Sequence, residues 1–202
     1  MPTSIDLASE TETLKADVYG ALPAARAAIL CHGQSWDASG WRDIAPRLVA
    51  RGVPALALNF RGYGGSSGKT GAWSTVTDVG VAKEWLKARG AKEIALIGAS
   101  MGGHAVLGSS FDRDVECVVS VSAPVEAIDD ALSKKVSGRK LFICASADSM
   151  GAAPHVLRTF ELCDQPKTLL MFGATEHSIG MFGAPYGGEV IAAMLDFVAG
   201  RR

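Results

Sequence analysis

Six short apolar runs in this chain lack the polar alternation of a sheet that has one face in water. They are Ala27–Cys31, Ala55–Phe60, Ile94–Ile97, Val118–Val121, Leu141–Cys144 and Thr168–Phe172. Continuous apolar runs of this length favour parallel strands that are covered on both faces. Helical segments separate them, so the sequence predicts an α/β fold. We expect a single doubly wound domain over residues 1–202, with helices on both faces of a mostly parallel sheet.

Three of the expected helices can be placed from their patterns. One covers about residues 41–51, and another covers about residues 188–199 with an apolar stripe. A third begins near Thr75, because Thr75 and Asp78 have the spacing of a capping box. Near the start of the chain, residues 4–8 and 13–19 predict a leading hairpin.

Charge and composition exclude several classes of partner. The net charge is −1, so no basic field exists to hold nucleic acid. No apolar stretch approaches the roughly 20 residues of a membrane span, so we expect no membrane contact. The first residues lack the pattern of a signal peptide, and the four cysteines form no C-x-x-C motif. We therefore expect a cytoplasmic protein with reduced thiols and no zinc site.

The sequence Gly98-Ala99-Ser100-Met101-Gly102 directly follows an apolar strand and precedes a run of small residues. This G-x-S-x-G pattern between a strand and a helix is typical of a tight turn that exposes a serine hydroxyl. Glycines on either side leave room for the strained backbone. Ser100 is therefore the candidate nucleophile. The alternative is a small-residue turn that packs a helix closely on a strand.

With this motif the chain resembles the α/β-hydrolase superfamily over nearly its whole length, as a small, capless, esterase-like serine hydrolase. That family orders its triad as nucleophile, acid and histidine, each after a strand. Asp148 follows the run Leu141–Cys144, and His177 follows Thr168–Phe172. The resemblance implies that Ser100, Asp148 and His177 are catalytic. The competing candidates are His104 and His155 for the base, and Asp129 and Asp130 for the acid.

The resemblance also implies an oxyanion hole. His32-Gly33-Gln34-Ser35 is similar to the His-Gly turn of the family, so the backbone N–H groups of Gln34 and Met101 are the expected donors. We expect His32 to be a structural turn residue.

The segment from Asn59 to Ser66 resembles the D-x-R-G-x-G-x-S segment of the same family, with Asn59 in place of the usual Asp. We expect this loop to be structural. Its continuation, Gly68-Lys69-Thr70, looks like the end of a P-loop, but Tyr63 stands where the first glycine of G-x-x-x-x-G-K-[ST] belongs. A nucleotide site is therefore not expected.

Only 19 residues separate Val121 from Leu141, which leaves room for one helix and predicts an open site without a cap domain. The bulky residues expected around its mouth are mostly apolar and suit a small or slender acyl group. They are Trp36, Tyr63, Met150, Ile179, Met181 and Phe182.

The function expected from these features is a serine hydrolase that cleaves carboxylic esters or related acyl bonds of small molecules through an acyl-enzyme, with no metal and no cofactor. Thioester, peptide and amide bonds stay open as alternatives, because fold does not fix the substrate. So does a cofactor-free peroxidase-like or acyl-transfer activity. A scaffold that binds a partner without catalysis is the alternative from another class. The oligomeric state is left open.

Overall fold

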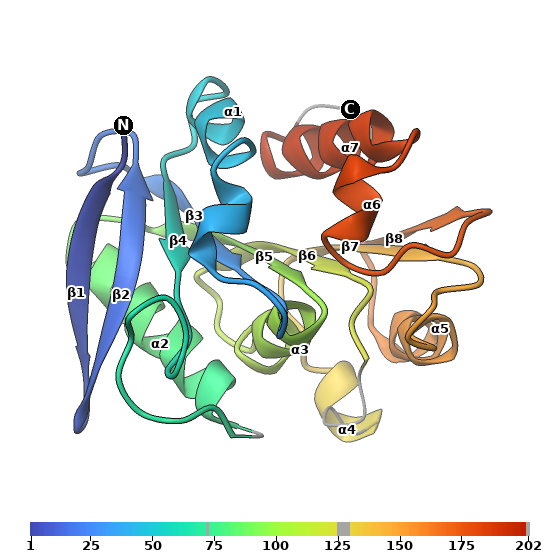
Figure 1. The fold of residues 1–202 in the computed structure, drawn as a ribbon, viewed down its shortest axis with the longest axis horizontal. Coiled ribbons are helices and arrows are strands. Elements are labelled where there is room, and N and C mark those ends of the chain that lie inside the picture. Colours follow the sequence, from blue (N-terminus) through green and yellow to red (C-terminus); the bar gives the residue numbers. More distant parts are fainter. Residues whose placement is uncertain (72, 125–129, 201–202) are drawn as a thin grey trace.

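The computed structural model describes residues 1–71, 73–124 and 130–200 as a sheet covered by helices on both faces (Figure 1). The strands are β1 (Thr3–Ser9), β2 (Glu12–Tyr19), β3 (Arg26–Cys31), β4 (Ala55–Leu58), β5 (Glu93–Ala99), β6 (Val115–Val121), β7 (Arg139–Ala145) and β8 (Lys167–Phe172). Their spatial order is β1-β2-β4-β3-β5-β6-β7-β8. The strands from β4 to β8 in this order are parallel, whereas β2 is antiparallel to both neighbours. The predicted sheet and leading hairpin are confirmed.

The helices form two layers (Figure 1). The helices α1, α6 and α7 lie above the sheet in that view, and α2, α3, α4 and α5 lie below it. Their bounds are α1 (Ala45–Val49), α2 (Ser74–Lys87), α3 (Met101–Gly108), α4 (Asp130–Ser133), α5 (Ala153–Leu162), α6 (Gly180–Gly183) and α7 (Gly187–Val198), with a 3-10 turn η1 (Ala38–Trp41) before α1.

Each face of the sheet has its own core, because side chains alternate along a strand. In β4, Leu56 and Leu58 belong to the core that includes residues of α2 and α3, whereas Ala55 and Ala57 belong to the core that includes residues of α1 and α7. All four of these residues are buried. Burying a leucine side chain contributes about 1.5–3 kcal/mol to the free energy of unfolding, and apolar side chains are buried on both faces of the sheet. The absence of polar alternation in the sequence follows directly from this double coverage.

Two helix predictions need correction. The helix expected over about residues 41–51 starts late and is shorter, because α1 covers only Ala45–Val49, with Pro46 in its first turn, and η1 ends at Trp41. The predicted capping box at Thr75 is wrong, because α2 already begins at Ser74 and Thr75 is buried inside it. The Asp78 carboxylate does not cap the helix. It binds Arg61 instead.

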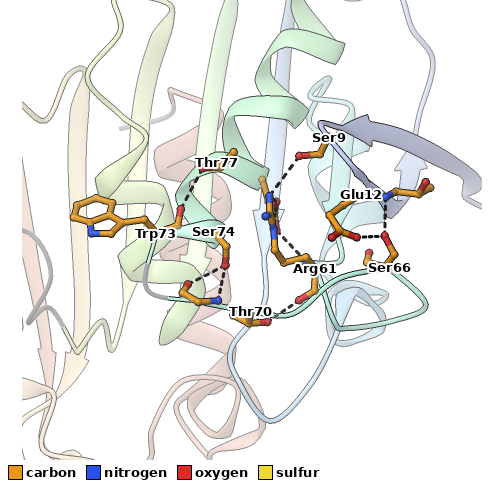
Figure 2. Close-up of polar contacts among 12 residues, drawn as sticks. Ser9, Glu12, Arg61, Ser66, Thr70, Trp73, Ser74 and Thr77 are labelled. Atoms are coloured by element: carbon orange, nitrogen blue, oxygen red, sulfur yellow. Dashed lines mark hydrogen bonds and ion pairs between the residues drawn. The ribbon is translucent and has the colours of Figure 1, made fainter.

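Arg61 anchors the loop between β4 and α2 to its surroundings (Figure 2). Its guanidinium donates to Asp78 Oδ1 from Nε at 2.9 Å and from Nη2 at 2.7 Å, and its backbone N–H donates to Oδ2 at 2.9 Å. The Asp78 side chain is fully buried. Thr70 Oγ1 donates to the carbonyl of Arg61 at 2.6 Å and closes the loop on itself. A buried carboxylate with three donors is costly to disturb.

The serines of this loop bind protein groups. Ser66 Oγ accepts from the backbone N–H of Lys15 at 2.8 Å and donates to the carbonyl of Asn59 at 2.9 Å. Ser67 Oγ accepts from the N–H of Thr13 at 2.8 Å. The Asn59 side chain accepts from the N–H of Ala38 through Oδ1 at 2.8 Å, so the asparagine joins this loop to η1. These bonds attach the loop to the β1–β2 hairpin and to η1, as its expected structural role requires.

The connection between β6 and β7 is too short for a separate domain. Its described part contains the short helix α4, and residues 125–129 lie outside the described residues. In the described ranges, no helix is both long and apolar enough to cross a membrane.

We expect replacement of Asp78 by alanine to lower the free energy of unfolding by about 3 kcal/mol, because it leaves the Arg61 guanidinium beside a buried site without its partner. Asp6→Ala is the matched control. It removes the pair between Asp6 and Lys15, whose side chains are 60% and 43% exposed, and should cost less than about 1 kcal/mol. Urea unfolding measures both values. Equal losses in the two variants would contradict the anchoring role of Asp78.

Candidate active site

Ser100 lies on the turn between β5 and α3 with a strained backbone. Its φ is 54° and its ψ is −118°, which is uncommon for a residue other than glycine. The N–H of Ser100 donates to the carbonyl of Val121 at 2.8 Å, so the end of β6 supports the turn. Strain of this kind persists only where the surrounding structure enforces it.

The glycines of the motif are required by close packing. A β-carbon on Gly98 would lie 2.1 Å from the carbonyl oxygen of Gly102, and one on Gly102 would lie 2.2 Å from the carbonyl oxygen of Cys31. Both distances are shorter than any van der Waals contact, so α3 can approach β5 and β3 only without these side chains. The packing explanation of the motif therefore holds, and the same packing exposes the serine.

Ser100, His177 and Asp148 form a continuous hydrogen-bonded series. His177 Nε2 is 2.8 Å from Ser100 Oγ, and His177 Nδ1 is 2.9 Å from each of the two Asp148 carboxylate oxygens. Because the carboxylate can only accept at Nδ1, the proton of neutral His177 is on Nδ1 and Nε2 is free to accept from the serine hydroxyl. This is the arrangement that a nucleophile with an adjacent base requires.

The turn after β7 fixes Asp148. Its Oδ1 accepts from the N–H of Met150 at 2.9 Å and from the N–H of Ala152 at 3.3 Å. The Cys144 thiol lies 3.9 Å from Oδ2. Burial, followed by the charge of Asp148, raises the pKa of this thiol to about 11, so it stays protonated at neutral pH. The carboxylate is held in one orientation toward His177.

The loop that carries His177 is attached to α7. Tyr186 Oη donates to Glu176 Oε2 at 2.8 Å, and the Tyr186 ring stacks on Phe172 with centroids 4.9 Å apart. This hydrogen bond lowers the pKa of Glu176, and burial together with Glu176 raises the pKa of Tyr186 to about 12. The pair was not expected from the sequence, because Tyr186 lies ten residues beyond Glu176 with no motif between them.

The competing histidines and acids lie elsewhere or outside the described residues. His104 is buried in α3, where its ring packs edge-on against Trp73 at 6.0 Å. His155 is half-buried in α5. Asp129 lies outside the described residues, and Asp130 begins α4 with a side chain that is not described.

His32 supports the turn after β3. Its Nδ1 donates to the carbonyl of Gly33 at 2.8 Å, and its Nε2 accepts from the N–H of Phe60 at 3.1 Å. These two bonds require the neutral imidazole with its proton on Nδ1. The side chain is fully buried, and this burial lowers the pKa of His32 below its usual value. His32 therefore fixes the conformation of Gly33 and of the residues that follow it.

The expected oxyanion donors lie at two neighbouring turns. Met101 is the first residue of α3, so its N–H has no acceptor within the helix. Gln34 follows Gly33 in the turn after β3 and lines the same cavity as Ser100. Within the described part of the chain, neither N–H donates to another group.

An open cavity of about 410 Å³ surrounds Ser100 and His177. Its lining consists of Gly33, Gln34, Ser35, Trp36, Ser100, Met150, His177, Ser178 and Ile179. Trp36, Met150 and Ile179, which the sequence assigned to the pocket, are therefore on it. A larger groove of about 580 Å³, between the β1–β2 hairpin and the end of α2, contains none of the three residues of the series.

The other three residues assigned to the pocket from the sequence do not line this cavity. Tyr63 packs edge-on against the buried His32 ring at 4.8 Å. Met181 is the fully buried residue of α6, and its sulfur accepts from Ser122 Oγ at 3.4 Å. The Phe182 ring contacts Trp41 at 5.6 Å. Each of these side chains packs within or against one of the two apolar cores, so the three residues are not assigned to the pocket.

The described residues contain no cluster of three or more His, Cys, Asp or Glu side chains that could hold a metal ion.

The cavity wall also includes Ser178, beside His177, which was not predicted from the sequence. No motif includes it.

Comparison with known proteins establishes the family. The profile of the Alpha/beta hydrolase family matches residues 28–199. The chain belongs to this family. Its structure is similar to the Pyrococcus furiosus esterase Pf2001, with a TM-score of 0.83 and 17% identity over 98% of this chain and 91% of that one. The α/β hydrolase GrgF from Penicillium has a TM-score of 0.85 and 15% identity over 98% of both chains. At these identities the likeness establishes the fold alone.

Matches to curated proteins are shorter. Protein ABHD14A of Danio rerio is 33% identical over 81 residues, which are 39% of this chain and 30% of that protein. The uncharacterized protein Rv2307c of Mycobacterium tuberculosis is 29% identical over 96 residues, which are 46% of this chain and 34% of its own length. The chain thus spans about a third of the length of the curated relatives that it matches.

We expect His32 to make the stability of this α/β hydrolase depend on pH. Its pKa is lowered in the folded protein, so below about pH 6.5 the unfolded chain takes up a proton that the folded protein does not. The free energy of unfolding should fall as the pH decreases through this range. In His32→Asn, which keeps a donor at the position of Nδ1, the fall should be smaller. Urea unfolding between pH 5 and 8 measures it, and an identical pH dependence in both proteins would contradict the assignment.

Proposed function

We propose that this α/β hydrolase is a serine hydrolase that cleaves carboxylic esters of small molecules through an acyl-enzyme. The observation that carries the proposal is the series from Ser100 Oγ to His177 Nε2 at 2.8 Å and from His177 Nδ1 to Asp148 at 2.9 Å. A protein that only binds a partner does not need a strained serine hydrogen-bonded to a histidine and an aspartate. The series therefore supports hydrolysis over that alternative.

In the first half of the proposed reaction, Ser100 Oγ attacks the ester carbonyl carbon while its proton moves to His177 Nε2. The carbonyl oxygen becomes negatively charged and accepts hydrogen bonds from the N–H groups of Gln34 and Met101. Each such donor is worth about 3 kcal/mol in the transition state. When the tetrahedral intermediate collapses, the bond to the alcohol oxygen breaks, and the imidazolium returns its proton to that oxygen.

The second half repeats these steps with water. His177 takes a proton from water, the resulting oxygen attacks the acyl carbon, and the proton is returned to Ser100 Oγ as the acid leaves. Asp148 keeps its charge throughout, holds the imidazole in the required tautomer and stabilises the imidazolium. The chemistry requires no group beyond these residues and water.

The choice of esters is supported by the relatives. The solved structures with this fold include the Pyrococcus furiosus esterase and a monoacylglycerol lipase from Paleococcus ferrophilus. Thioesters and amides would react by the same first step, so the measured rates of hydrolysis of esters, thioesters and amides distinguish these substrate classes.

The four buried, unpaired cysteines support the reducing environment of the cytoplasm as the location of this activity.

We expect Ser100→Ala and His177→Ala to lose at least about 10³-fold in kcat/KM for short-chain p-nitrophenyl esters. Asp148→Asn should lose about 10²- to 10⁴-fold, because its amide no longer enforces the tautomer. The matched control is His155→Ala, which changes a half-buried histidine of α5 away from the cavity and should keep the wild-type rate. Hydrolysis by Ser100→Ala at the wild-type rate would contradict the proposal.

A further inference from the structure

The indole of Trp36 forms one wall of the cavity and lies directly against the backbone behind it. A β-carbon on Gly40 would lie 2.1 Å from Trp36 Cε3 and 2.5 Å from its Cζ3, and one on Gly33 would lie 2.5 Å from its Nε1. Trp36 lines the cavity, whereas Gly40, which belongs to η1, does not. The ring therefore lies between the cavity and η1, packed on backbone that carries no side chain.

Aromatic side chains fill the space behind this wall. The centroid of the Trp36 ring is 5.3 Å from that of Trp41, which in turn is 5.6 Å from that of Phe182. Trp41 is fully buried. Because a close-packed interior leaves few voids, the Trp36 ring cannot withdraw from the cavity without displacing the core behind it.

Ile179 extends the same wall, whereas Met150 does not confine the cavity. A β-carbon on Gly40 would lie 3.0 Å from Ile179 Cδ1, so Ile179 and the indole pack against the same glycine. Met150 also lines the cavity, but it is 72% exposed. An unbranched side chain with this exposure changes its rotamer readily. The fixed boundary of the cavity is therefore the indole of Trp36, with Ile179 beside it.

The lining of the cavity also limits the charge of its ligand. Among the described residues that line it, none is Asp, Glu, Lys or Arg. A charged substituent would lose hydration there without gaining an ionic partner, which is unfavourable. The cavity thus suits a neutral, apolar group beside the indole.

We propose that Trp36 is a specificity-determining residue, whose indole limits the length of the ester chain that lies against it. The inference rests on the proposed ester hydrolysis and narrows its substrates to neutral esters with a short chain at this wall. A chain that is too long would have to displace a ring that is packed on backbone. One methylene group too many in a filled apolar pocket lowers kcat/KM by about 10- to 200-fold.

The test measures chain-length profiles in two series of esters. The p-nitrophenyl esters of acetate, butyrate, hexanoate and octanoate vary the acyl chain, and ethyl, butyl, hexyl and octyl acetate vary the alcohol chain. The readout is the ratio of kcat/KM for the longest ester to that for the shortest ester in each series. In the wild type this ratio should be about 0.1 or less in the series whose chain meets the indole.

In Trp36→Ala the ratio in that series should rise by about tenfold or more, because removal of the ring leaves room for the longer chain. Trp36→Phe keeps a smaller ring and should raise the same ratio by less. The matched control is Trp73→Ala, since Trp73 is 48% exposed, directly precedes α2 and does not line the cavity. Both ratios of this control should equal those of the wild type.

A melting temperature for each variant shows whether it is folded. If Trp36→Ala does not fold, Trp36→Phe is the variant that decides. Unchanged ratios in a folded variant would overturn the inference. An equal loss of rate for all the esters would also overturn it, because that result assigns Trp36 to support of the turn that carries Gln34.

The wild type separates this inference from the proposed function. Equal hydrolysis of the longest and the shortest esters in both series contradicts the length limit alone. A wild type that hydrolyses none of the esters contradicts the proposed function, and with it the role of Trp36.

Discussion

The close approach of α3 to the sheet is the constraint on which the candidate site depends. Gly98 and Gly102 allow it, since a β-carbon at either position would lie within 2.2 Å of a backbone oxygen. The approach forces Ser100 into its positive φ and directs its hydroxyl toward the cavity. The two apolar cores bury β5 between them, and this burial offsets the energetic cost of the strained backbone at Ser100.

Parallel strands bring the remaining groups to the same edge. The turn at Gly33 follows β3, Ser100 follows β5, Asp148 follows β7 and His177 follows β8. The carboxyl ends of parallel neighbours lie side by side, so Ser100 and His177, which are 77 residues apart in the sequence, come within hydrogen-bond distance of each other. Local contacts then set the orientation of each group, for example the two backbone N–H groups that hold Asp148.

Much of this arrangement could be predicted from the sequence. Apolar runs without alternation predict covered parallel strands, and the resemblance to the α/β-hydrolase superfamily, which places its triad after such strands, implies that Ser100, Asp148 and His177 meet. The remainder depends on contacts between distant residues. Asp78 has the spacing of a capping residue, yet Arg61 binds it. Met181 follows the histidine closely, but the first turn of α6 directs it into the core. The fixed position of the Trp36 indole is recognised only once its surroundings are known.

The proposed hydrolysis requires that the fold assembles an activated serine at Ser100. The most direct test is intact-mass analysis after treatment with a fluorophosphonate, applied to the wild type and to Ser100→Ala. We expect one adduct on the wild type and none on the variant, because only a hydroxyl with an adjacent base reacts readily with this reagent. A folded wild type that forms no adduct, or a variant that is labelled equally, would contradict it.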